Sequence, residues 1–290
     1  MTLLLAVPNV SEGRDTAVLD AIGAAFTGGG ARLLDRHVDP DHHRAVFSLA
    51  GGPGQLSGAL VAGAAEAAAR IDLRGPRGQH PHIGAIDVAP VVFLTAAERG
   101  AACAEALIVA DRLGRELQLP VFLYGVLAGG RTRAELRRGG IEALARRMDE
   151  GELRPDYGPH ALHPSAGAVL VAARPPLVAF NVELDPPADL ATARAIAASI
   201  REGGEQGIPG LRAIGIELHA RGHTAQVSMN VERPDEASLA QIVAAIARHA
   251  DVAAAEIVAL VPEAALVDFP AEIEIRGFDP ARQIIENHLD

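Results

Sequence analysis

The stretch RLLDRHVDPDHHRAVFSLA at Arg32–Ala50 joins two apolar-rich runs through a polar turn. We expect strands at Arg32–Val38 and Ala45–Ala50, with the turn at Asp39–Asp41, because Asp and Pro favour turns between extended runs. A hairpin of this kind between two helices is typical of the split βαβ arrangement. The fold class therefore depends on the segments that flank it.

The flanking segments predict one βαββαβ unit. In chain order, the expected elements are a strand at Leu3–Val7, a helix from about Ser11 to Gly28–Gly30, the hairpin, a helix with Pro53 at its first position that runs to about Ile71, and a strand at Ile86–Leu94. Proline at the first helical position and glycine after the last are common helix boundaries. A further helix at about 97–117 and a strand at 121–124 follow.

The same order of elements recurs in the second half of the chain. The expected elements there are strand Leu177–Leu184, helix Leu190–Glu202, strands Leu211–Leu218 and Gln226–Val231, helix Glu236–His249 and strand Ala255–Leu260. Between the halves, Arg131–Met148 is an Arg-rich helical stretch and Glu152–Pro164 is interpreted as a connector without periodicity. We predict an α+β fold with two ferredoxin-like (βαββαβ) subdomains, residues 1–175 and 176–290, and a ligand cleft between them.

Composition excludes several classes of protein. The 290 residues, 49% of them hydrophobic, suffice for two compact domains. The net charge of −11 disfavours general nucleic-acid binding, because an acidic chain gains little from phosphate neutralisation. A single cysteine, Cys103, excludes an intramolecular disulfide framework. Neither a basic signal-peptide start nor a long apolar stretch is present, so we expect a cytoplasmic protein without membrane contact.

The strongest local motif is GQHPHIGAID at Gly78–Asp87. Pro81 restricts the backbone of His80, and a histidine held in a loop suits general acid–base catalysis near neutral pH. The alternative is a pair of solvated loop histidines, His80 and His82. A zinc site would need a third ligand, and the candidates in similar loops are His42, His43, His160 and His163. Because no zinc signature is present, we expect no metal.

Two further loops carry candidate binding groups. Asp39 and Arg44 lie at the hairpin turn, where arginine would bind a carboxylate through two hydrogen bonds, although such turns are more often only hydrophilic tips. In VPNVSEGR, Asn9, Ser11 and Glu12 precede a predicted helix, whose start attracts anions. The alternative there is a simple helix cap by Ser11.

Polar side chains also interrupt two predicted strands of the second half. Gln226, Ser228 and Asn230 would share one face of their strand, and Asn181 stands in an apolar strand. Such uncharged groups would bind a heterocycle or an amide. The alternative is the solvent-exposed face of an antiparallel sheet.

Together these motifs resemble the formiminotransferase domain family. The resemblance covers nearly the whole chain, in order. The matching segments are VPNVSEGRD (7–15), RAVFSLAG (44–51), GQHPHIGAIDVAP (78–90), LPVFLYG (119–125), RPDYGP (154–159), LVAFNVEL (177–184), GLRAIGIEL (210–218), AQVSMNV (225–231), VALVPEAAL (258–266) and GFDPARQIIENHL (277–289).

The resemblance implies two subdomains that hold tetrahydrofolate as co-substrate in a cleft, a homodimer, and a general acid–base at His80. It implies transfer of a formimidoyl group between tetrahydrofolate and glutamate, with glutamate or formimidoylglutamate as the other substrate. Four positions depart from the family pattern: Gln79 for Glu, His82 for Arg, His43 for Asn, and Pro175 for a basic residue. The sequence also leaves no room for a cyclodeaminase half, so we expect no cyclodeaminase activity.

Two other functions remain alternatives. One is a folate-dependent formyl- or formimidoyltransferase with a different acceptor, which the departures favour. The other is a folate-binding module without catalysis. In the preferred interpretation His80, Asp39 and Arg44 are catalytic, and the substrates are bound by the remaining candidates: Asn9, Ser11, Glu12, His82, Asn181, Gln226 and Asn230.

Overall fold

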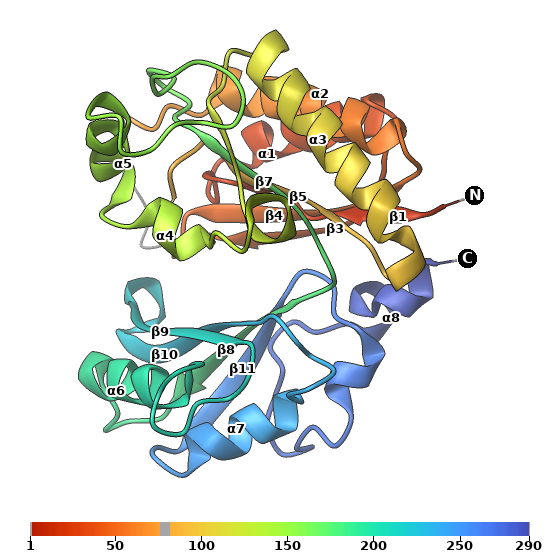
Figure 1. The fold of residues 1–290 in the computed structure, drawn as a ribbon. Coiled ribbons are helices and arrows are strands. Elements are labelled where there is room, and N and C mark those ends of the chain that lie inside the picture. The colour runs from red at the N-terminus through yellow and green to blue at the C-terminus, as the bar shows by residue number, and fades with distance from the viewer. Residues whose placement is uncertain (1, 76–81, 290) are drawn as a thin grey trace. The chain divides into compact units, whose positions relative to one another are not determined.

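The computed structural model describes residues 2–75 and 82–289 of a mixed α/β protein (Figure 1). The chain divides into two compact units, Met1–Pro175 and Pro176–Asp290. Apolar side chains form a separate core cluster in each unit. None of the described helices combines the length and apolar character that crossing a bilayer requires.

The first unit is built on a seven-stranded sheet. Its elements are β1 (Leu4–Ala6), β2 (Asn9–Val10), α1 (Thr16–Gly28), β3 (Arg32–Asp39), β4 (Arg44–Gly51), α2 (Gln55–Arg70), β5 (Ile86–Val92), α3 (Arg99–Glu116), β6 (Val121–Leu123), α4 (Arg133–Arg137), α5 (Gly140–Asp149) and β7 (Val169–Arg174). Strand β4 pairs antiparallel with β3 on one side and with β1 and β2 on the other. Strands β1 and β2 also pair antiparallel with β5, and parallel pairing then links β5 to β7 and β7 to β6.

The predicted hairpin forms, with Asp39 opposite Arg44 at its tip. The predicted first strand is longer than expected and is divided at Pro8, which has no N–H to donate. The Pro8 carbonyl nevertheless accepts a hydrogen bond from the N–H of Phe47 at 3.0 Å. The short strands β1 and β2 therefore follow one path beside β4.

Strand β7 was not predicted. Its side chains alternate between two cores: Val169 and Val171 pack with α1–α3, whereas Leu170 and Ala172 pack with Leu136 and Leu144 of α4 and α5. A strand buried on both faces shows a continuous apolar run without polar alternation, so no period marks it.

Two helix starts differ from the predicted ones. Helix α1 begins at Thr16, where Asp15 is the cap and its Oδ1 accepts from the N–H groups of Ala17 and Val18. Ser11 is therefore not the cap, and its hydroxyl bonds elsewhere.

Helix α2 begins at Gln55, two residues after Pro53, and its N-terminus is satisfied by a distant side chain. Glu105 of α3 is 1% exposed and accepts from the N–H of Gly54 at 2.8 Å and of Ser57 at 2.6 Å. A carboxylate at a helix N-terminus is stabilised by the unpaired N–H groups and the helix dipole.

The second unit contains a four-stranded antiparallel sheet in the order β11-β8-β10-β9. Its elements are β8 (Val178–Leu184), α6 (Leu190–Ile200), β9 (Leu211–Leu218), β10 (Thr224–Val231), α7 (Leu239–Ala247), β11 (Val252–Val258) and the short α8 (Pro280–Gln283). One face of the sheet packs against α6 and α7 through alternate residues such as Phe180, Val227 and Ile257. The other face carries the intervening side chains.

We predict that Glu105→Gln destabilises the first unit by roughly 1.5–3 kcal/mol, the typical contribution of hydrogen bonds to a charged group. The amide would place N–H donors against the N–H groups of Gly54 and Ser57. Urea unfolding followed by circular dichroism measures the change. The matched control is Glu116→Gln at the exposed end of the same helix, which should leave the free energy of unfolding nearly unchanged. Equal effects of the two substitutions would contradict the capping role of Glu105.

Candidate functional site

Two adjoining pockets in the first unit bring together most of the candidates of that unit. The smaller pocket is lined by Asn9, Val10, Ser11, His42, Arg44, His82 and Asp87. The larger pocket, of about 170 Å³, is lined by Ser11, Glu12, His43, Arg70, Ile71, Asp72, Leu73, Gly75 and His82. Ser11 and His82 line both. His80, with Gln79, lies outside the described residues.

The chain on the C-terminal side of residues 76–81 is fixed by the first loop and by a neighbouring strand. The Ser11 hydroxyl donates to the Gly84 carbonyl at 2.7 Å, and the Ser11 N–H donates to the Ala85 carbonyl at 2.9 Å. A Cβ on Gly84 would lie 1.9 Å from the Ala168 carbonyl oxygen, so only glycine is accommodated there. This packing explains why serine stands at position 11 in the VPNVSEGR motif and glycine at position 84 in the GQHPHIGAID motif.

Asp87 fixes the same segment from inside the sheet. It is 2% exposed, and its Oδ1 accepts from the N–H of Ile83 at 2.7 Å while Oδ2 pairs with the Arg137 guanidinium of α4. On the N-terminal side of residues 76–81, the N–H of Leu73 donates to the Ser165 carbonyl at 2.9 Å. The chain is therefore anchored on both sides of the segment that contains His80.

Asp39 forms a buried pair with His42 at the hairpin tip. Its Oδ1 accepts from the His42 N–H at 2.9 Å, and its Oδ2 pairs with the His42 Nδ1. Burial alone would raise the pKa of Asp39, but the hydrogen bonds and charge of His42, with the charge of Arg44, lower it from 3.8 to about 2. Asp39 is therefore ionised at neutral pH and orients the His42 imidazole, which lines the smaller pocket.

The surroundings of His43 favour the neutral form of its imidazole. Burial lowers its pKa, the charges of Arg14 and His82 add to this effect, and Glu12, whose Oε1 lies 3.4 Å from Nδ1, opposes it. The N–H of Gly13 donates to His43 Nδ1 at 3.1 Å, which places the imidazole proton on Nε2. His43 has φ of 51°, a left-handed conformation that Asn and His adopt more readily than most residues. The family's asparagine at this position is consistent with the same backbone.

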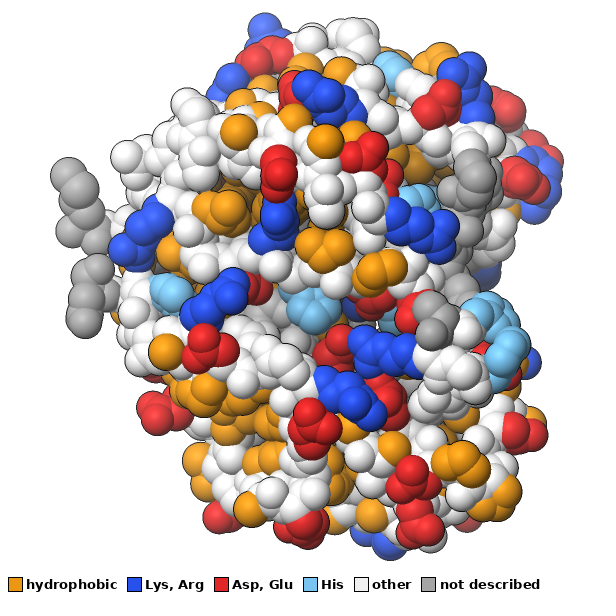
Figure 2. Space-filling view, turned by 180° about the vertical axis from the view of Figure 1, so that it is seen from behind, with side chains coloured by type: hydrophobic (Ala, Val, Ile, Leu, Met, Phe, Trp, Pro, Cys, Tyr) orange, Lys and Arg blue, Asp and Glu red, His pale blue; other side chains and the backbone are white. Residues whose placement is uncertain are grey.

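The arginines near the pockets differ in their surroundings. Arg74 pairs with Asp72 through Nε at 2.9 Å and Nη2 at 2.6 Å, and the Arg14 Nε donates to the Pro40 carbonyl at 3.1 Å. Arg44 lines the smaller pocket, and Arg77 lies outside the described residues. Acidic and basic side chains are interspersed over the face shown in Figure 2, where the described residues form no broad basic area.

The candidates of the second unit lie on the sheet face opposite α6 and α7. As predicted, Gln226, Ser228 and Asn230 share this face, and Asn181 lies opposite Ser228 on the neighbouring strand. The Asn181 amide donates to Glu256 Oε2 at 3.0 Å. Gln226 is fully buried, and neither polar atom of its side chain has a hydrogen-bond partner among the described residues.

The same face carries charges that were not predicted. Glu183, 3% exposed, pairs with the guanidinium groups of Arg221 and Arg276, and Arg221 also lies 3.4 Å from Glu256. A signal was present in VAFNVEL, where Glu183 follows Asn181 by two residues and therefore shares its face. Asp87 was likewise part of a quoted motif without an assigned role. His42 was considered only as a metal ligand, and His43 only as a metal ligand and as a departure from the family pattern.

The family described as "Formiminotransferase domain, N-terminal subdomain" matches residues 3–174. A glutamate formimidoyltransferase of Streptococcus pyogenes is 37% identical over 98% of this chain and 97% of its own length, and that of Thermoplasma acidophilum is 32% identical over 100% and 98%. A formimidoyltransferase-cyclodeaminase of Sus scrofa is 35% identical over 93% of this chain, which spans 52% of that relative. The chain belongs to the formiminotransferase family.

Proposed function

We propose that this chain is a glutamate formimidoyltransferase, an enzyme that transfers a formimidoyl group between tetrahydrofolate and L-glutamate. The observation that carries the proposal is its similarity to the S. pyogenes glutamate formimidoyltransferase over nearly the full length of both chains. Tetrahydrofolate would act as co-substrate. A homodimer stays a prediction from the family, and a cytoplasmic location stays a prediction from the sequence.

The reaction requires two proton transfers. The attacking nitrogen must lose a proton when it adds to the formimidoyl carbon, and the departing nitrogen must gain one when the tetrahedral intermediate collapses. One histidine with a pKa near neutrality would perform both steps in turn. We assign this role to His80, which is two residues along the chain from His82 of both pockets.

The acceptor carries two carboxylates, and the chain carries a net charge of −11. A glutamate site therefore needs a local cation. Arg74 pairs with Asp72, and Arg44, opposite Asp39 at the hairpin tip, lines a pocket beside His82 and Asn9. We assign Arg44 to the substrate carboxylate, because a guanidinium binds a carboxylate through two parallel hydrogen bonds.

Asp39 would act mainly through its neighbours. Its ionised carboxylate orients His42 and lies near Arg44 in the hairpin register. Ser11 and Glu12 would hold the loop in place: Glu12 Oε1 accepts from the N–H groups of Gly13 and Arg14 at 2.8 and 2.7 Å.

The pteridine would be bound by neutral polar groups, because a buried heterocycle needs few but well-placed hydrogen bonds. We propose Asn9, Asn181, Gln226 and Asn230 for these contacts. Gln226 supports the proposal most, since a buried amide without partners costs roughly 1–3 kcal/mol unless water or a ligand satisfies it.

We also propose that both units are ferredoxin-like, each a βαββαβ arrangement. The sheet order β11-β8-β10-β9 and the order β5-β1-β4-β3 within the larger sheet support this. The ligand cleft between the subdomains stays a prediction.

A paralogue with another acceptor is the second candidate, because His43 and His82 depart from the family pattern beside the proposed substrate site. Thermal unfolding with folate and with glutamate, added separately, separates the candidates, since a ligand stabilises only the protein that binds it. Stabilisation by folate alone would favour the paralogue or a non-catalytic folate-binding module.

His80→Ala should lower kcat by about 100- to 10,000-fold, the usual contribution of a positioned general acid–base, while the dissociation constant for folate changes little. Steady-state kinetics and a folate titration measure the two effects. His160→Ala, at an exposed loop histidine, is the control and should retain full activity. Near-normal turnover of His80→Ala, combined with loss of activity in His82→Ala, would refute the assignment.

Arg44→Lys should raise the KM for the amino-acid substrate by an amount equivalent to roughly 1–3 kcal/mol, because lysine cannot copy the bidentate contact. The KM for folate should change less. Kinetics with each substrate varied in turn give both values. The matched control is Arg14→Lys, at an exposed arginine of the first loop whose Nε donates to the Pro40 carbonyl of the hairpin turn. An unchanged amino-acid KM in Arg44→Lys would remove this residue from the acceptor site.

Asp39→Asn should change the pH dependence of stability. The pKa of Asp39 is lowered from 3.8 to about 2 in the folded protein, so its ionised form stabilises the fold above pH 4, and this contribution is lost as the pH falls toward 2. The difference in unfolding free energy between wild type and variant should therefore be largest at pH 5–7 and narrow below pH 4. Urea titrations across this range measure it, and a difference independent of pH would contradict the pairing with His42.

A further inference from the structure

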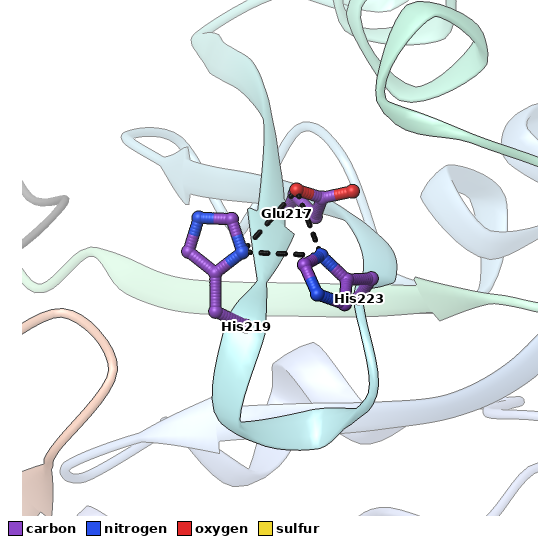
Figure 3. A group of neighbouring side chains, drawn as sticks. All are labelled: Glu217, His219 and His223. Atoms are coloured by element: carbon purple, nitrogen blue, oxygen red, sulfur yellow. Dashed lines mark hydrogen bonds and ion pairs between the residues drawn. The ribbon is translucent and has the colours of Figure 1, made fainter.

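A group of three potential metal ligands lies at the turn between β9 and β10, in the second unit. Glu217 is near the end of β9, His219 is in the short 3-10 helix that follows (His219–Arg221), and His223 directly precedes β10. Figure 3 shows the Glu217 carboxylate and one nitrogen of each imidazole turned toward one another. Glu217 Oε2 lies 3.3 Å from each Nδ1, and the two Nδ1 atoms lie 3.2 Å apart.

No arrangement of protons satisfies Glu217 Oε2 and the two Nδ1 atoms of His219 and His223 together: at least one of their three contacts stays unfavourable. If one Nδ1 is protonated, it can donate to the other two atoms, but the second Nδ1 and the carboxylate oxygen then face each other as acceptors. If both Nδ1 atoms are protonated, two donors face each other at 3.2 Å. A cation at the centre of the triangle formed by Glu217 Oε2 and the two Nδ1 atoms would attract the lone pairs of all three atoms at once.

The triangle also has the size that a tetrahedral zinc ion requires. Zinc binds histidine nitrogen and carboxylate oxygen at about 2.0–2.2 Å, which places neighbouring tetrahedral ligands roughly 3.3–3.5 Å apart. The three observed separations are 3.2–3.3 Å. The imidazole rings cross at 74° with centroids 5.0 Å apart, so neither ring lies stacked over the other.

We propose that Glu217, His219 and His223 form a binding site for a divalent metal ion, and that Zn²⁺ is the ion this site mainly binds. Two imidazoles and one carboxylate are a common three-ligand set for zinc, and the fourth position would hold water. The side chains of His219 and His223 are 59% and 69% exposed, so the ion has direct access from solvent. The proposal departs from our expectation of no metal, which considered only histidines of the first unit.

Metal binding would also hold in place the turn that carries Arg221. This residue lies between the two histidines in sequence, and its guanidinium pairs with Glu183 and Glu256 on the polar face of the sheet. His223 has φ of 64°, a conformation that surrounding contacts must maintain. Zinc should therefore raise the unfolding temperature of the protein, because it binds the folded turn preferentially.

The test is a calorimetric titration of the chelator-treated full chain with Zn²⁺. The variants are His219→Ala, His223→Gly, which relieves the backbone strain, and Glu217→Gln. The control is His249→Ala, at an exposed histidine of the same unit outside the triangle. Visible absorption of bound Co²⁺ reports tetrahedral coordination independently, and circular dichroism checks that each variant is folded.

We expect one zinc ion per chain in wild type and in His249→Ala. Each histidine substitution should weaken zinc binding by more than about 100-fold. Loss of a residue that only hydrogen-bonds to a zinc ligand already lowers metal affinity by roughly 10–100-fold. Absence of zinc binding to wild type, or unchanged binding in a variant with both histidines replaced, would overturn the proposal, and neither result depends on the proposed transferase activity.

Discussion

A buried carboxylate, Asp87, connects the elements on which the proposed active site depends. It accepts the N–H of Ile83 and pairs with Arg137 of α4, so it links the end of the histidine-containing segment to the helix that covers the second face of the sheet. A charge at 2% exposure is tolerated only when its partners replace the lost water. His82, the Ser11 loop and the hairpin tip then meet at two adjoining pockets.

The two units contribute different chemistry to the proposed function. The first supplies imidazoles and a guanidinium: His42 is oriented by an ionised Asp39, burial lowers the pKa of His43, and Arg44 lines a pocket. The second supplies amides and an ion-pair network on one sheet face, where Glu183 and Glu256 compensate the charge of Arg221. In the proposed function, proton transfer and anion binding would therefore be carried out by the first unit, and the neutral groups of the second would bind the heterocycle.

Much of this architecture could be predicted from local patterns, because a half-buried strand or helix shows its period in the sequence. The polar side of β10 is an example, whereas the hairpin at Arg32–Ala50 is marked by its Asp-Pro turn between two apolar-rich runs. Strand β7 could not be predicted in this way, because burial on both faces removes the alternation of polar and apolar side chains. The cap of α2 by Glu105 and the Asp39–His42 pair depend on packing and side-chain geometry, which spacing does not specify. The same holds for the triangle at Glu217, whose spacing corresponds to no common metal motif.

The central claim is that this chain uses glutamate as the partner of tetrahydrofolate. The most direct measurement is the formation of 5-formimidoyl-tetrahydrofolate from tetrahydrofolate and a panel of formimidoyl amino acids that differ in length and charge. Our account predicts the highest kcat/KM with formimidoyl-L-glutamate, and much lower values for substrates that lack the side-chain carboxylate. Equal or faster turnover of an uncharged substrate, or no turnover of any substrate by a protein that binds folate, would contradict it.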